Sequence, residues 1–135
     1  KLSGPLLDRI DLQIPVPRLK PEELAGLATG ESSAVVARRV LEARQRQAAR
    51  QARQGLVVLN AHLSPRELRQ HAELDADSQK LLTDAARAFG LSARAFDKII
   101  RVARTIADLD AVDRIASQHV AEAIQYRTID PFATA

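Results

Sequence analysis

The stretch from Leu91 to Asp110 constrains this chain most, because it combines helix-start and helix-stop signals with one continuous apolar stripe. Gly90 ends the preceding segment, and the side-chain oxygen of Ser92 suits the free N–H groups of a first helical turn. Apolar residues then recur every three or four positions, at Phe96, Ile99, Ile100, Ala103, Ile106 and Ala107. This spacing predicts a long helix with one buried face.

Arg94 stands in the first turn of this predicted helix. A cation there is disfavoured by the helix dipole, by about 0.3–1 kcal/mol. Free backbone N–H groups beside a guanidinium, however, form a good phosphate site. The pattern therefore leaves two interpretations of Arg94, a phosphate-binding residue or a solvated surface arginine.

The rest of the chain is also predicted to be mainly helical. Alanine, leucine, arginine, glutamine and glutamate favour helix, and no long β-branched run indicates a large sheet. Capping signals, including the Ser64 and Glu67 capping box with Pro65 in the first helical position, delimit the helices. We expect helices over about 33–54, 65–72, 76–89, 93–110 and 117–127. Residues 32–128 should thus form a helical bundle, followed by a flexible tail over 129–135.

The first of these helices changes character along its length. Val36, Val40 and Leu41 make its first half apolar, whereas RQRQAARQARQ in its second half is almost entirely polar. A helix that loses its apolar face either ends in solvent or meets a charged partner. Arg46, Arg50 and Arg53 are candidate contacts to a DNA phosphate backbone, although no aromatic residues accompany them for base stacking.

Residues 1–31 predict a different kind of structure. Pro5 suits the start of a short helix, and Asp11 to Pro17 alternates apolar and polar residues, as a half-buried edge strand does. A lone strand needs a sheet, so this segment is interpreted as the remnant of a truncated α/β core, followed by a linker. Lys1 is not an initiator methionine, and we expect a fragment. Without its upstream core, the segment should be poorly ordered or pack opportunistically.

Composition excludes several classes of site. The chain has no cysteine, and its three histidines lack a metal-ligand spacing, so we expect no metal site. No signal peptide or long apolar run is present, which favours a cytoplasmic chain without membrane contact. No GxxxxGK[ST] phosphate loop and no nucleophilic triad can be assembled. The chain alone should not be a complete enzyme.

Several motifs resemble one protein family. The segment SGPLLDRID, from Ser3 to Asp11, is similar to the arginine-finger segment of magnesium chelatase-like and MCM-type AAA+ ATPases. Ser92-Ala93-Arg94 resembles the sensor 2 motif in the helical lid of the same group. With TGESS at 29–33 and RVARTIADL at 101–109, the chain resembles the C-terminal part of the ComM/YifB magnesium chelatase-like proteins, from Leu2 to about Arg127.

This resemblance implies a function for the full-length protein. Members of the family are AAA+ ATPases in hexameric rings, which bind ATP and Mg²⁺ between adjacent subunits. Arg9 would be the arginine finger that reaches a neighbour's γ-phosphate, and Arg94 would be sensor 2, each touching ATP phosphates together with the upstream core. The resemblance leaves open whether Arg94 touches the nucleotide of its own subunit or that of the neighbour. A planar, always-charged guanidinium suits the charge that develops during phosphoryl transfer. Asp8 and Asp11 flank Arg9 and are candidates to hold it in place.

The resemblance leaves the macromolecular client open. One branch of the family drives DNA branch migration as a ring helicase, and the 29–33 and 101–109 segments are more similar to that branch. A chelatase-type ATPase subunit is the alternative within the family. A free-standing basic helical module that binds nucleic acid or a protein partner is a second alternative. A structural interaction domain with inert arginines is a third.

Overall fold

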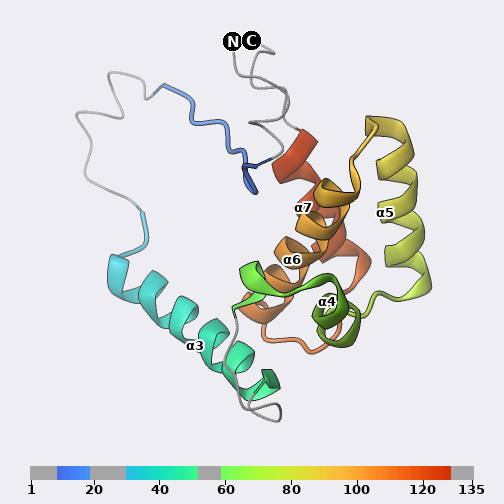
Figure 1. Ribbon diagram of the computed structural model, residues 1–135. Coiled ribbons are helices and arrows are strands. Elements are labelled where there is room, and N and C mark those ends of the chain that lie inside the picture. The colour runs from blue at the N-terminus through green and yellow to red at the C-terminus, as the bar shows by residue number, and fades with distance from the viewer. Residues whose placement is uncertain (1–8, 19–29, 52–58, 129–135) are drawn as a thin grey trace.

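The computed structural model describes residues 9–18, 30–51 and 59–128 of the chain. This part is mainly helical, with five α-helices and one short 3-10 helix, shown in Figure 1. They are α3 (Ser33–Gln51), η2 (Asn60–His62), α4 (Pro65–His71), α5 (Ala76–Phe89), α6 (Ala93–Leu109) and α7 (Ser117–Thr128). The predicted helical bundle is confirmed over these residues. The continuation of the first helix to residue 54 and the tail at 129–135 lie outside the described residues.

Local capping sets the helix ends where the sequence predicts them. The Ser64 hydroxyl accepts a hydrogen bond from the Glu67 N–H, and the Glu67 side chain accepts one from the Ser64 N–H, which completes the capping box before Pro65. Ser92 caps α6 by accepting from the Ala95 N–H at 3.2 Å. Gly90 closes α5 with φ of 60°, a left-handed conformation that favours glycine.

The core lies between α6 and the helices around it. In Figure 1, α6 and α7 lie side by side at the centre, with α5 beside α7 and α3 on the other side of α6. The apolar stripe of α6 faces this core: Ile99, Ala103 and Ala107 are fully buried, and Phe96 and Ile100 are partly buried against them. The other apolar residues that are at most 1% exposed are Leu63, Leu82, Ile115, Val120 and Ala123. The predicted stripe is therefore confirmed.

Helix α3 packs against α6 through its second half, which is the more polar half by composition. Val36, Val40 and Leu41, in the first half, are 40–58% exposed. In the second half, Ala43 and Gln47 are only 4% exposed, on the side that meets α6. The polar half packs there because Gln47 accepts from the Asn60 N–H and Arg50 pairs with Asp108. A hydropathy pattern does not predict such polar contacts.

The predicted strand over 11–17 is not formed in the described part of the chain. Residues 12–18 have no regular secondary structure, and Pro15 and Pro17 have no N–H to donate to a ladder. Instead, the Gln13 N–H donates to the carbonyl oxygen of Tyr126 in α7 at 2.8 Å. The α/β remnant predicted for this segment is therefore wrong in its strand, because no second strand is available among the described residues to pair with it. Most of the predicted short helix after Pro5 lies outside the described residues.

None of the described helices combines the length and the apolar character that crossing a membrane requires.

Candidate functional site

Arg94 projects from the first turn of α6, as the sequence predicts. Its side chain is exposed, and no described residue forms a hydrogen bond or an ion pair with it. The first turn of α6 contains no acidic residue that would balance the arginine. An exposed guanidinium beside free N–H groups is available to an anion from outside this domain.

Arg9 is also exposed, and it precedes a segment that is attached to the helical bundle. Asp11, two residues further on, forms an ion pair with Lys98 of α6 at 2.6 Å. Arg127 of α7 donates to the carbonyl oxygen of Ile10. Asp11 therefore pairs with Lys98 of α6 and not with Arg9. Asp8, the other acid predicted to hold Arg9, lies outside the described residues.

These contacts bring the two candidate arginines to one end of the bundle. Arg94 precedes Lys98 by four residues, or about one helical turn of 6 Å. Arg9 precedes Asp11 by two residues, which span at most about 7 Å. Figure 1 shows the described N-terminal segment beside the start of α6 and the end of α7. The sequence alone gives no reason for Arg9 and Arg94, 85 positions apart, to share this end.

The arginines in the basic half of α3 have different surroundings, although the sequence predicts the same role for them. Arg46 is exposed and remains a candidate phosphate contact. Arg50 instead turns inward and pairs with Asp108 of α6 through both guanidinium nitrogens, with its side chain 20% exposed. Arg50 therefore already has a carboxylate partner within the domain, and its assignment as a DNA contact stays a prediction. Arg53 lies outside the described residues.

Asp108 is the centre of a buried polar cluster that sequence analysis did not identify. Its side chain is fully buried and accepts from Arg50, from Arg104 at 3.1 Å and from the Asn60 amide at 2.8 Å. Arg104 also donates to the carbonyl oxygens of Val112 and Asp113, in the loop that follows α6. The cluster joins α3, η2, α6 and this loop.

Burial also affects the electrostatics of the cluster. Burial lowers the pKa of Arg104 from its ordinary value, and the charge of Asp108 acts in the opposite direction. An arginine pKa is so high that the side chain stays protonated. The available sequence signal was the i,i+4 spacing of Arg104 and Asp108, but such pairs on helices are usually solvent-exposed.

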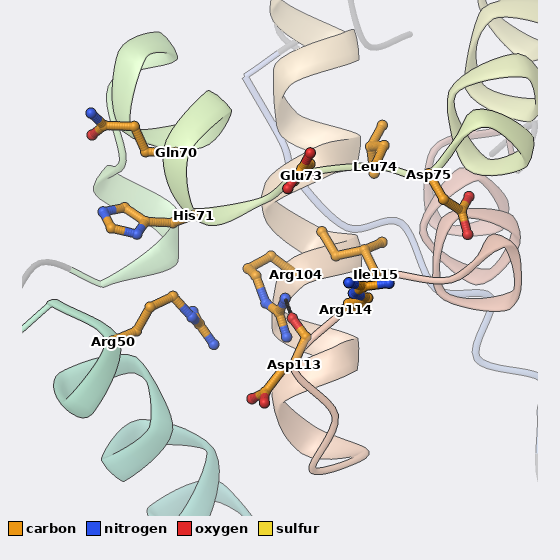
Figure 2. A pocket seen from close by; sticks show the side chains of 10 residues that line it. All are labelled: Arg50, Gln70, His71, Glu73, Leu74, Asp75, Arg104, Asp113, Arg114 and Ile115. Atoms are coloured by element: carbon orange, nitrogen blue, oxygen red, sulfur yellow. Dashed lines mark hydrogen bonds between the residues drawn. The ribbon is translucent and has the colours of Figure 1, made fainter.

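The cluster borders a pocket of about 490 Å³, shown in Figure 2. Arg50 extends from α3 toward Arg104 of α6, and Asp113 and Arg114 follow from the loop after α6. The lining contains three arginines and three acidic residues. Because neither charge is in excess and Asp108 already holds two of the arginines, the pocket does not have the character of a phosphate site. The lining residues are Arg50, Gln70, His71, Glu73, Leu74, Asp75, Arg104, Asp113, Arg114 and Ile115.

The described architecture is that of a small helical domain with an arginine-bearing end. Residues 30–127 match the family model described as magnesium chelatase, subunit ChlI C-terminal. The chain therefore belongs to this family of magnesium chelatase C-terminal domains.

Curated relatives extend the match into the N-terminal segment. The chain is 44% identical over 131 residues to YifB of Salmonella typhimurium and 39% identical over 130 residues to the competence protein ComM of Haemophilus influenzae. It is 36% identical over 127 residues to protein Mb2921c of Mycobacterium bovis. These alignments cover 94–96% of this chain but 25% of each relative. The chain thus corresponds to about a quarter of the length of these relatives.

Proposed function

We propose that this chain is the lid portion of an AAA+ ATPase and supplies two arginines to the phosphates of bound ATP. Arg9 acts as the arginine finger and Arg94 as sensor 2, and the upstream part of the full-length protein binds most of the nucleotide and its Mg²⁺. One observation carries the proposal: both arginines are exposed, neither pairs with a described residue, and both belong to the same end of the bundle.

The chemistry fits this arrangement. Phosphoryl transfer depends on positioning and on neutralising the charge that spreads over the equatorial oxygens. A guanidinium donates in a fixed plane and stays charged, so it can serve both purposes. An arginine finger accelerates hydrolysis by about 10³–10⁵-fold. Arg104, which is also charged, is excluded from this role because it is buried and its Nη1 and Nη2 groups are bound inside the domain.

We also propose that the full-length protein assembles into a ring, with six subunits as the expected number, and that its client is DNA. The support is the 39% identity to ComM, which is named a competence protein, together with the motifs at 29–33 and 101–109. A chelatase-type client remains the alternative, favoured by the family description of residues 30–127. ATPase stimulation by branched DNA would separate the two.

The decisive experiment is steady-state ATP hydrolysis by the full-length protein, with and without branched DNA. We expect Arg9→Ala and Arg94→Ala to lower kcat by about 10³-fold or more while nucleotide binding is largely retained. Arg69→Ala is the matched control, because Arg69 is an exposed arginine of α4 and no described residue pairs with it. Unchanged turnover in both variants would show that the two arginines are structural.

A further inference from the structure

Among the described residues, Lys98 forms the ion pair that joins the N-terminal segment to the bundle. Its Nζ lies 2.6 Å from Oδ1 of Asp11. The Lys98 side chain is only 19% exposed, whereas the Asp11 side chain is 54% exposed. The Lys98 side chain is therefore largely buried at the surface of the bundle, whereas Asp11 lies on the outside of this ion pair.

One backbone hydrogen bond and one side-chain hydrogen bond align the segment further, and both involve the end of α7. The Gln13 N–H donates to the Tyr126 carbonyl oxygen, and Arg127 donates to the Ile10 carbonyl oxygen. The bond between the neutral Gln13 and Tyr126 groups is a weak restraint, whereas the bond from the charged Arg127 guanidinium is a stronger one. Ile14 and Val16 of the segment are 62% and 87% exposed, whereas Ile10 and Leu12 are 37% and 47% exposed, so apolar burial holds the segment only in part.

We infer that Lys98 is a positioning residue, which pairs with Asp11 and thereby fixes Arg9 relative to Arg94. This inference rests on the proposed function of the two arginines. Arg94 lies one turn before Lys98 on the same helix. The ion pair between Asp11 and Lys98 therefore limits the distance between Arg9 and Arg94. The position of one guanidinium group relative to the other is then fixed before the reaction, and this preorganisation favours the transition state.

A positioning role for Lys98 differs measurably from a role in fold stability alone. A structural residue would lower activity whether or not Arg9 is present. A residue that acts through Arg9 should have no further effect once Arg9 is replaced, because coupled residues are non-additive. The ion pair should also respond to the sign of its charges, so exchanging the two charges should restore it.

The test uses the full-length protein with the variants Lys98→Glu, Asp11→Lys and the double charge exchange. We expect Lys98→Glu to lower kcat about fivefold or more with an unchanged KM for ATP, as loss of a partly exposed ion pair would. The double exchange should recover most of this loss. In an Arg9→Ala background, Lys98→Glu should have no further effect. Lys80→Glu is the matched control, since Lys80 is an exposed lysine of α5.

Hydrogen exchange provides a readout that does not depend on activity. Lys98→Glu should speed amide exchange in peptides covering residues 9–18, which include the bonded Gln13 N–H, and Lys80→Glu should not. Unchanged exchange in Lys98→Glu would overturn the inference, as would faster exchange with unchanged kcat. If Arg9→Ala and Arg94→Ala are inactive but Lys98→Glu is not impaired, only this inference fails. If the two arginine variants retain full turnover, the proposed function fails, and the inference fails with it.

Discussion

Replacing Asp108 with alanine tests whether the buried charge cluster holds α3 onto the bundle. The substitution removes a carboxylate that is fully buried and leaves Arg104, whose side chain is 2% exposed, without its charged partner. Arg50, at 20% exposure, can partly turn toward water, so most of the cost arises at Arg104 and at the Asn60 amide. Breaking a buried pair by removing one partner costs about 3–5 kcal/mol. Domains are stable by only about 5–15 kcal/mol, so this loss is a large fraction of the total.

Urea denaturation followed by far-ultraviolet circular dichroism measures the effect, because the chain has no tryptophan and a single tyrosine for fluorescence. We expect a lower midpoint with an unchanged slope, which indicates lower stability rather than a more compact unfolded state. Asp84→Ala is the matched control: Asp84 lies 3.8 Å from Arg87 in an exposed pair and should cost less than about 1 kcal/mol. Equal effects of the two substitutions would refute the reasoning.

Further predictions concern the helix ends and the core. Ser64→Ala should destabilise the domain by about 0.5–2 kcal/mol in the same assay, because it removes the cap of α4. Hydrogen bonds from the Ser64 side chain and backbone lower the pKa of Glu67 from its ordinary value of 4.5, so the stabilisation by ionised Glu67 is present above pH 4.5 and lost as pH falls through the lowered pKa. The stability difference between wild type and Glu67→Ala should therefore shrink on acidification, and a constant difference would contradict this. Gly90→Ala should lower the free energy of unfolding by about 1 kcal/mol through backbone strain alone. The reason is that φ is 60° and no neighbouring atom lies within 4 Å of the added methyl group. A loss of several kcal/mol in the urea assay would contradict this. Ile99→Ala should cost about 2–5 kcal/mol, because Ile99 is completely buried, and a smaller loss would show that the core collapses around it.

The sequence predicted local structure well because local physics sets helix ends. Caps such as Ser64, Ser92 and Gly90 act on backbone groups within a few residues, so their chemistry can be recognised without knowledge of the tertiary structure. The stripe on α6 was predictable for the same reason, since its period of three to four residues follows from the geometry of one helix. The family membership of the chain was also predictable, from the short motifs at 3–11, 29–33, 92–94 and 101–109.

The sequence by itself therefore determined which residues form helices, which face of α6 is buried and which family the chain belongs to. Only the tertiary structure decided that Arg50 pairs with Asp108, and that Asp11 pairs with Lys98. It also decided that residues 12–18 stay without a strand. The physical reason is that each outcome depends on a partner distant in the sequence: 58 positions separate Arg50 from Asp108. A charge pattern shows that such residues need partners, but packing selects which partner each one meets.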